Sequence, residues 1–404
     1  MLTPPSNTLG SNFHLDTHWF SCRNVIHLIT VVAIILAQGC SVVPERNPAP
    51  YNDGEMAQIS GITEARFWGD EPTPFSEDLS AIPKDELRAK YPAIFGTRHN
   101  YLALSGGGQD GAFGAGILVG WTEAGTRPEF TMVTGISTGA LIAPFAFLGP
   151  EYDEQLKVLY TTLSTKDILK PHLATESVAS SEPLQAILAT YIDEEMLQAL
   201  KHEYRRGRRL LIGTTNIDAA RPVTWDITVI ADSGKPEALD LIRRIMLASA
   251  SIPVAFPPVL FDLEIDGIHF DEMHVDGGVT SQIFLYPVGV DWPEVQKFYE
   301  VKGMPHAYVI RNAKLDPLWD PVSRQVIELA SRSIASLLRT QGIGDMYRIA
   351  LSSQRDGIDF NMTYIPDDFD QKAEQPFDEK YMNQLFNLGY QMAKSGYPWL
   401  KSPP

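Results

Sequence analysis

Two glycine-rich turns constrain the fold of this chain most strongly, because each joins a short apolar run to a helical stretch. The first turn, 105–111, follows the apolar run 101–104 and precedes a helical pattern. The second turn, 135–139, lies between the strand-like run 130–134 and the helical stretch 141–148. Strands that alternate with helices predict a largely parallel sheet covered by helices on both faces. The expected fold class is therefore α/β, with three α/β/α layers.

The same alternation continues along the rest of the chain, which predicts one large domain over 96–397. Two strands, 259–265 and 268–275, form a predicted hairpin at the favoured turn dipeptide Asp266-Gly267. The further strands are predicted over 210–214, 222–230, 306–311 and 360–365. The further helices are predicted within 151–205 and over 239–247, 321–353 and 378–395.

Composition excludes several classes of protein. Hydrophobic residues make up 44% of the 404 residues, so the chain can bury a large core. The 50 acidic residues outnumber the 33 basic ones and give a net charge of -17. Such a surface repels phosphate backbones, so we expect no nucleic-acid partner. The two cysteines, Cys22 and Cys40, are too few for zinc ribbons, iron–sulfur clusters or a disulfide scaffold.

The first forty residues have the features of an export signal. Residues 25–37 are apolar except for His27 and Thr30, and Arg23 precedes them. A run of this length suits the core of a signal peptide and is too short for a comfortable membrane span. The run closes with 36–40, Leu-Ala-Gln-Gly-Cys, which resembles the lipobox of bacterial lipoproteins.

That resemblance implies a signal peptide over 1–39 and a lipid on Cys40, the first residue of the mature chain. The acyl chains would tether the protein to a membrane without spanning it. Ser41 follows the cysteine, and lipoproteins without Asp there usually go to the outer membrane. We therefore expect a lipid-anchored protein of the bacterial cell envelope that faces the periplasm, with 40–95 as a linker and N-terminal extension. The alternative is a buried N-terminal strand or helix with a chance cysteine.

The first glycine motif contains Gly106, Gly107, Gly108 and Gly111. Without side chains, the backbone N–H groups can approach a ligand closely, and at the start of a helix they favour negative charge. Such a loop can hold a phosphate or a transient oxyanion. Gly106, Gly108 and Gly111 also satisfy G-x-G-x-x-G, the fingerprint of dinucleotide-binding proteins. A tight turn that needs small residues is the alternative.

The second motif is Gly135-Ile136-Ser137-Thr138-Gly139, and its strand–turn–helix context is that of a nucleophile elbow. The serine would occupy a strained turn, and the glycines would relieve clashes between strand and helix. A helix start capped by Ser or Thr is the alternative. The third motif, Asp276-Gly277-Gly278, ends a predicted strand. Its carboxylate could accept the serine proton, although Asp-Gly turns are common.

The order, spacing and context of the three motifs together resemble the patatin-like phospholipase family. Its pattern is a glycine-rich oxyanion loop, a G-x-S-x-G elbow roughly thirty residues later and a late D-G-[AG]. Here Ser137 follows Gly106 by 31 residues, and Asp276 follows Ser137 by 139. Residues 248–258 resemble the family segment upstream of the aspartate, and 214–225 its middle pair of strands. The resemblance covers most of the mature chain.

The resemblance implies a patatin-like fold with a mainly parallel central sheet and the activity of a serine lipid acyl hydrolase. Ser137 would be the nucleophile, and Asp276 would activate it without a histidine. The amides of Gly107 and Gly108 would form the oxyanion hole, with Gly106 shaping the loop. The enzyme would cleave acyl esters of phospholipids or related lipids through an acyl-enzyme, with no metal or other cofactor. Because one aspartate serves as acid and base, burial should raise its pKa.

Two charged features bear on lipid binding. Many family members have Arg or Lys two residues after the third glycine, where this chain has Asp110. A cation there could support the oxyanion or anchor a phosphate, and an anion cannot. A basic run could touch anionic head groups, or it could be a helix end with solvated charges. The run consists of Lys201, Arg205, Arg206, Arg208 and Arg209.

Three other interpretations use the same residues. An α/β-hydrolase esterase would need a Ser-Asp-His triad, for which His306 follows Asp276 by 30 residues. His274 would then support the site or would merely be a satisfied side chain. A nucleotide-binding oxidoreductase would use the glycine fingerprint and Glu129, 18 residues after Gly111, but it leaves the elbow unexplained. A non-catalytic envelope lipoprotein with a degenerate site is the third.

Overall fold

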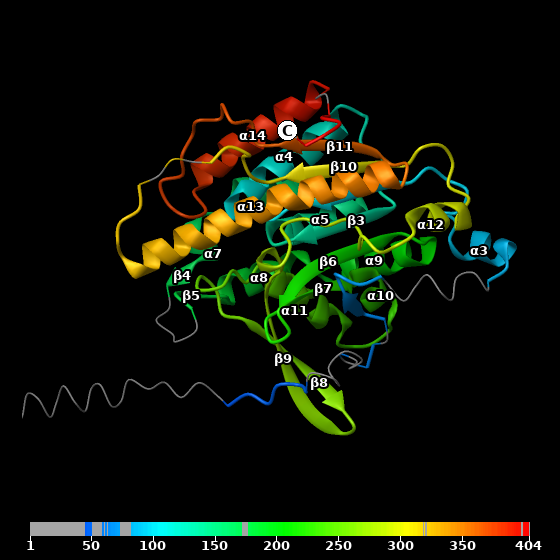
Figure 1. Cartoon of the computed structure of the whole chain (residues 1–404), viewed down its shortest axis with the longest axis horizontal. Helices are drawn as coiled ribbons and strands as arrows, with labels where there is room; N and C mark the ends of the chain where they lie inside the picture. The colour runs from blue at the N-terminus through cyan, green and yellow to red at the C-terminus, as the bar shows by residue number, and fades with distance from the viewer. Residues whose placement is uncertain are drawn as a thin grey trace, which may run out of the picture. The chain divides into compact units, whose positions relative to one another are not determined.

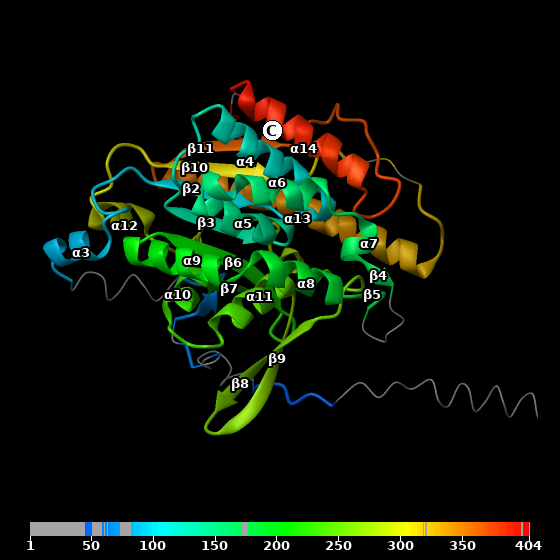
Figure 2. The same cartoon turned by 180° about the vertical axis from the view of Figure 1, so that it is seen from behind.

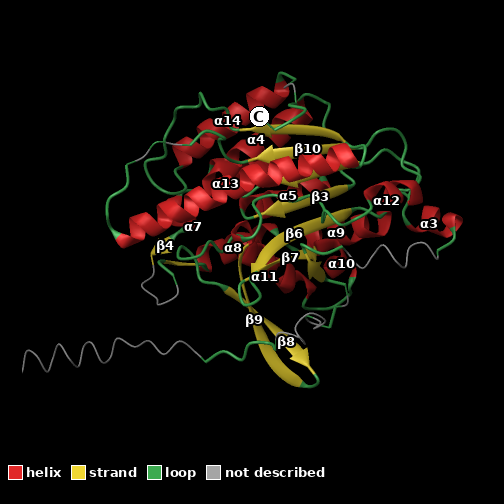
Figure 3. Ribbon diagram, in the orientation of Figure 1, coloured by secondary structure: helices red, strands yellow, loops and turns green. Residues whose placement is uncertain are grey.

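Among the described residues, nine strands pair into one sheet: β1 (Arg66–Trp68), β2 (Asn100–Leu104), β3 (Met132–Ile136), β6 (Arg209–Asn216), β7 (Arg221–Asp226), β8 (Val259–Ile265), β9 (Ile268–Asp276), β10 (His306–Arg311) and β11 (Asp359–Tyr364). The order is β1-β7-β6-β3-β2-β10-β11, and the β8–β9 hairpin joins β6 through β9 (Figure 3). The strands from β6 to β11 in this order are parallel. β7 is antiparallel to β6, because the short turn between them cannot make a parallel crossover.

The computed structural model describes residues 45–50, 59, 61–62, 64–72, 82–171, 177–317, 319, 321–396 and 399–403. The predicted signal peptide and Cys40 lie outside these residues. The sheet belongs to the unit Arg46–Pro404, which Figure 1 and Figure 2 show from opposite sides. Among the described helices, none combines the length and the apolar character that crossing a bilayer requires.

Helices cover both faces of the sheet. On one face, Leu102 and Leu104 of β2 share a core with residues of α4 (Gly111–Glu123), α5 (Thr138–Leu148) and α14 (Glu379–Lys394). On the other face, Tyr101 and Ala103 of the same strand share a core with Met346 of α13 (Val326–Arg355), which crosses the front of the sheet in Figure 1. The period of two along β2 therefore divides its side chains between two helical layers. This arrangement confirms the predicted α/β class with a mainly parallel central sheet.

The remaining elements connect or flank these layers. The helices are α3 (Lys84–Lys90), α6 (Asp153–Thr161), α7 (Thr165–Ile168), α8 (Glu182–Tyr191), α9 (Glu194–Arg206), α10 (Ile227–Asp232), α11 (Ala238–Ser249) and α12 (Trp292–Phe298). The 3-10 turns are η3 (Gly108–Asp110), η4 (Pro150–Tyr152) and η5 (Gly277–Val279). A separate pair of short strands consists of β4 (Lys170–Pro171) and β5 (Ala179–Ser180).

The sequence predicted the β8–β9 hairpin correctly but not the end of β7. β8 and β9 turn at Asp266-Gly267 as predicted, and both turn residues have positive φ, at 52° and 78°. The predicted strand over 222–230 is wrong beyond Asp226. The Asp226 side chain accepts a hydrogen bond from the Val229 amide at 3.0 Å and so begins α10. An N-cap aspartate therefore overrides the β-branched pattern of the following residues.

Part of the predicted N-terminal extension packs onto the sheet. β1 pairs with β7 through three residues, from Arg66 opposite Trp225 to Trp68 opposite Val223. Ile59 and Ile62 are 3% and 5% exposed and belong to the main core. These contacts make the described part of this segment an integral edge of the domain.

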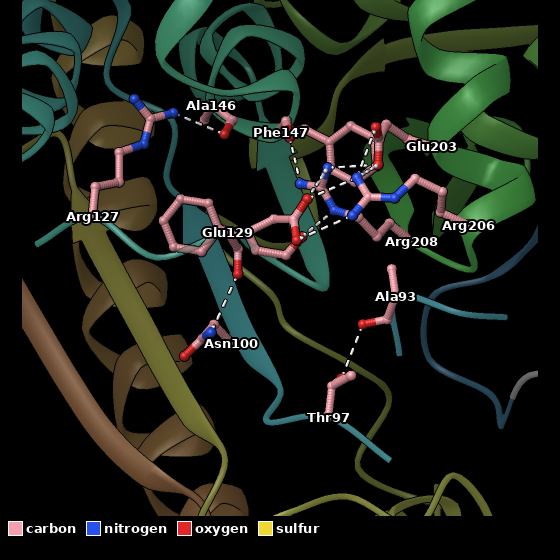
Figure 4. Close-up of polar contacts among 11 residues, drawn as sticks. Ala93, Thr97, Asn100, Arg127, Glu129, Ala146, Phe147, Glu203, Arg206 and Arg208 are labelled. Atoms are coloured by element: carbon pink, nitrogen blue, oxygen red, sulfur yellow. Dashed lines mark hydrogen bonds and ion pairs between the residues drawn. The ribbon is translucent and has the colours of Figure 1, made fainter. Parts of the chain in front are cut away.

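The basic run at the end of α9 is used within the fold. Arg208 is 3% exposed, and its guanidinium donates to two backbone carbonyl oxygens and to Glu203 (Figure 4). Arg206 makes ion pairs with both Glu203 and Glu129, at 2.8 Å each. The Arg208–Glu203 pair is buried, so removing one partner would leave the other charge buried without a counter-ion. These two arginines are therefore structural, not a surface for lipid head groups.

Candidate active site

Ser137 lies in a strained turn between β3 and α5. Its backbone has φ 55° and ψ -126°, a region that a residue with a side chain rarely adopts. The Ser137 amide donates to the Ser249 hydroxyl at 3.0 Å, and that hydroxyl donates to the Gly213 carbonyl at 2.7 Å. A Cβ at Gly139 would lie 2.4 Å from the Leu104 carbonyl oxygen, so only glycine lets α5 approach β2 this closely. The elbow predicted from the sequence is the local geometry observed.

The glycine-rich loop follows β2 and faces the elbow. A Cβ at Gly106 would lie 3.3 Å from the Ser137 Cβ, which places the loop directly beside the serine. The Gly106 amide donates to the Gln282 carbonyl at 3.1 Å. The amides of Gly107 and Gly108 make no hydrogen bond within the described part of the chain. They remain available to a ligand, as the oxyanion-hole prediction requires.

Asp276 ends β9 and is 5% exposed. Its Oδ1 accepts the Gly278 amide at 2.7 Å, and its Oδ2 has no hydrogen-bond partner of normal geometry among the described residues. Burial raises the pKa of Asp276 to about 7, and the neighbouring Ser137 hydroxyl and the Gly278 amide counteract part of that rise. A carboxyl with this pKa exchanges a proton readily near neutral pH.

The register of the strands brings the three motifs to one edge of the sheet. Leu104 pairs with Gly135 across β2 and β3, and Ile136 pairs with Gly213 across β3 and β6. Asp276 pairs with Thr214 of β6, so its carboxyl reaches the same edge from an antiparallel strand. The supporting glycines pack where any Cβ would lie 2.1–2.5 Å from another atom: Gly111, Gly135, Gly139, Gly277 and Gly278.

An apolar pocket lies beside Ser137, and no feature of the sequence predicted it. Gly108, Ser137 and Thr138 line it near the elbow. It leaves about 810 Å³ free of protein atoms, including its open mouth. The wall comes largely from α5 and α8, whose apolar side chains there include Leu141, Phe145, Leu184, Ile187 and Leu188. Such a wall suits a hydrocarbon chain. These apolar side chains lie outside the three motifs, so no local signal marked them.

The Asp110 side chain is bound to α14. Its Oδ1 accepts a hydrogen bond from the Tyr381 hydroxyl of α14 at 3.0 Å. Burial raises the pKa of Asp110 to about 6, while the Tyr381 hydrogen bond and the charge of Lys314 oppose the rise. The acidic residue at this position therefore serves the contact between the loop and α14.

Histidine is not part of the observed cluster. His306 begins β10, pairs in register with Asn100 at the start of β2, and contacts the Asp359 carboxylate at 2.9 Å. Ser137 follows the opposite end of the parallel strands, so His306 cannot complete a triad with it. Glu129 is the acid of the oxidoreductase interpretation. Its main-chain carbonyl accepts a hydrogen bond from the Asn100 side chain, so it lies beside the start of β2, at the end away from the glycine-rich loop. Neither rival assembles its required residues.

His274 is a satisfied core side chain. It is completely buried, and its two ring nitrogens contact the Thr214 hydroxyl at 2.9 Å and the Glu272 carboxylate at 3.2 Å. Its ring packs between Trp225 and Phe261. Burial lowers its pKa, so the neutral ring is favoured. Within the described residues, no group of His, Cys, Asp and Glu is arranged to hold a metal ion.

Two residues outside the predicted set hold the elbow and the loop. Ser249 fixes the Ser137 amide, as described above. Asn312, directly after β10, donates to the Ser105 hydroxyl at 2.8 Å and to the Ser105 carbonyl at 2.9 Å, and accepts the Gly114 amide at 3.0 Å. Ser249 lies in a segment that resembles the family, whereas nothing in the sequence marked Asn312.

Comparison with known families identifies the region. Residues 102–288 match the family model described as patatin-like phospholipase. This stretch is a patatin-like phospholipase domain. The match begins within β2 and contains the glycine loop, the elbow and the Asp276 turn, and it supports a lipid hydrolase function for the chain. A search of curated proteins found no match.

Two solved structures have weak similarity to this chain. The crystal structure of VipD from Legionella pneumophila has 12% identity and a TM-score of 0.37, over 74% of this chain and 67% of VipD. The type III effector protein ExoU has 13% identity and a TM-score of 0.29, over 74% of this chain and 53% of ExoU. Likeness at this level supports no detailed argument.

We expect Ser249→Ala to destabilise the protein, because it leaves the buried Ser137 amide and Gly213 carbonyl without their shared partner. The free energy of unfolding should fall by about 1–3 kcal/mol. Urea denaturation followed by circular dichroism measures this loss. Ser333→Ala is the matched control, since the exposed Ser333 hydroxyl bonds the Leu329 carbonyl of its own helix and no other described residue. It should change stability by less than about 0.5 kcal/mol. Equal stability of the two variants would contradict the role given to Ser249.

Proposed function

We propose that this chain is a serine lipid acyl hydrolase that cleaves acyl esters of phospholipids or related lipids. One observation carries the proposal: the Ser137 hydroxyl stands on a strained turn, next to a buried carboxyl with a raised pKa, at the mouth of an apolar pocket. Each part of this arrangement meets a requirement of ester hydrolysis. The family match to residues 102–288 supports the same substrate class.

The proposed reaction uses Ser137 and Asp276 as a dyad. The Ser137 oxygen attacks the ester carbonyl carbon while its proton passes to the Asp276 carboxylate. The amides of Gly107 and Gly108 donate to the resulting oxyanion, a contribution of about 3 kcal/mol for each well-placed donor. The C–O bond to the alcohol then breaks, and the leaving alcohol takes the proton from Asp276. Water repeats the sequence on the acyl-enzyme, releases the fatty acid and restores the serine.

The apolar pocket would hold the acyl chain of the substrate. Its wall excludes water from the chain and gains free energy roughly in proportion to the apolar area it covers. Gly108 and Ser137 lie at one side of this wall, so a chain bound in the pocket presents its ester carbonyl to both. The Asp110 carboxyl is held by the Tyr381 hydroxyl of α14, so the proposed oxyanion hole uses the loop amides and not this side chain.

We expect Ser137→Ala and Asp276→Asn each to lower hydrolysis of a long-chain phospholipid by at least about 10³-fold, because each removes one member of a unit that acts together. Released fatty acid, measured by mass spectrometry, checks this. Both variants should fold. The stability of Asp276→Asn relative to wild type should also be greater at pH 8 than at pH 4. Above the raised pKa, only the wild-type protein loses free energy of unfolding by burying an ionised Asp276.

The outcome separates the competing functions. Hydrolysis that survives Asp276→Asn but is lost in His306→Ala would favour the triad esterase. Folded wild-type protein without hydrolysis of any ester would favour a non-catalytic envelope protein.

The proposal extends to the location of the enzyme. The apolar run 25–37 and the lipobox-like residues before Cys40 support cleavage after residue 39 and a lipid on Cys40. The protein would then be tethered to the outer membrane of a bacterium, on the periplasmic side, close to its substrate. Tethering raises the local concentration of enzyme at a lipid surface without any further contact.

An alkyne analogue of palmitate, fed to bacteria that express the full chain, tests the anchor. Wild-type protein should carry the label and sediment with outer membranes, and Cys40→Ser should lose both properties. Cys22→Ser is the matched control and should keep them. Unlabelled wild-type protein would contradict the anchor without affecting the proposed chemistry.

A further inference from the structure

Gln282 contacts both loops that form the candidate active site. Its carbonyl oxygen accepts the Gly106 amide at 3.1 Å, which fixes the start of the glycine-rich loop. Its side-chain Nε2 donates to the Gly278 carbonyl at 3.0 Å, which fixes the turn after Asp276. One residue thus joins the loop with the predicted oxyanion donors to the turn with the predicted base.

The Gln282 carboxamide also packs into the narrow space between these loops. A Cβ at Gly106 would lie 3.1 Å from its Oε1, and 3.3 Å from the Ser137 Cβ. A Cβ at Gly278 would lie 2.4 Å from its Nε2 and 2.9 Å from Asp276 Oδ1. The two glycines therefore leave room for the carboxamide, which is a close neighbour of both members of the dyad.

Asp345 of α13 holds the main chain around Gln282. Asp345 is 1% exposed, and its Oδ2 accepts from the Gln282 amide at 2.7 Å and from the Ser281 hydroxyl at 3.2 Å. The same oxygen lies 3.4 Å from the Ile283 amide. α13 begins after residue 288, where the family match ends, so a helix outside the matched region anchors the loop.

We infer that Gln282 is a positioning residue, which keeps the glycine-rich loop and the Asp276 turn at the mutual distance that ester hydrolysis requires. The inference rests on the proposed function of Ser137 and Asp276. A neutral carboxamide suits this place, since it donates to Gly278 without adding charge beside Asp276. Glutamate has the same length but no donor, and its charge would disfavour ionisation of Asp276. Asparagine is one methylene shorter, so its amide would not reach the Gly278 carbonyl or fill the space beside Gly106 from the same main-chain position.

The experiment compares Gln282→Ala, Gln282→Asn and Gln282→Glu with wild type and with Gln198→Glu, in the full chain. Gln198 is exposed on α9 and, among the described residues, its side chain bonds Glu194 alone, so its variant controls for the added charge. Steady-state kinetics with p-nitrophenyl butyrate gives kcat and KM, and hydrogen exchange with mass spectrometry reports on peptides that cover 105–111 and 276–282.

Gln282→Ala and Gln282→Asn should lower kcat about 10- to 100-fold, with KM changed less than about threefold, because misplacing reacting groups slows the chemical step more than binding. Both variants should exchange amide hydrogens faster in the two loops. Gln282→Glu should shift the acidic limb of the pH profile of kcat/KM upward by about one unit, since a nearby carboxylate raises the pKa of Asp276 further. Gln198→Glu should change none of these.

Exchange that stays unchanged at both loops in Gln282→Ala would overturn the inference, and so would full kcat with an unshifted profile in Gln282→Glu. Wild-type protein that hydrolyses no ester would refute the proposed function instead. The exchange measurement would still decide in that case whether Gln282 holds the two loops together.

Discussion

The backbone of Ser137 is the constraint on which the rest of the site depends. A positive φ at a residue with a side chain costs about 1–3 kcal/mol, and it persists only where the surroundings fix it. Here β3 delivers the chain to the turn, Gly139 lets α5 leave it at close range, and Ser249 holds the Ser137 amide. The turn places Ser137 at the sheet edge where the glycine-rich loop and Asp276 also lie.

Burial of Asp276 sets the chemistry of that edge. The same exclusion of water that raises its pKa to about 7 would strengthen hydrogen bonds from the loop amides to an oxyanion. A single carboxyl can then accept and return a proton without a histidine. The cost is a free-energy penalty on the folded protein above that pKa. The proposed function and stability therefore make opposite demands on this one residue.

Features that depend on neighbouring residues were predictable, and features that depend on distant pairing were not. The strand–glycine–helix context located the Ser137 elbow, because a parallel sheet brings the ends of its strands together. The same local reasoning failed after Asp226, where a capping side chain ended the strand early. The apolar pocket, the contacts of Asn312 with Ser105 and the bond between Gly106 and Gln282 join segments more than a hundred residues apart, so no periodicity or motif reports them. The position of His306, at the end of the parallel strands opposite Ser137, could be learned only from the strand register.

The most direct test of the dyad is the pH dependence with which a fluorophosphonate labels Ser137. The labelled residue is located by mass spectrometry, and the rate is followed from pH 5 to pH 9 (about two units to either side of the raised pKa). The account predicts labelling at Ser137 with a rate that rises through a midpoint near pH 7, the pKa of Asp276, and is lost in Asp276→Asn. Labelling at another residue, or an equally fast reaction of Ser137 in Asp276→Asn, would contradict it.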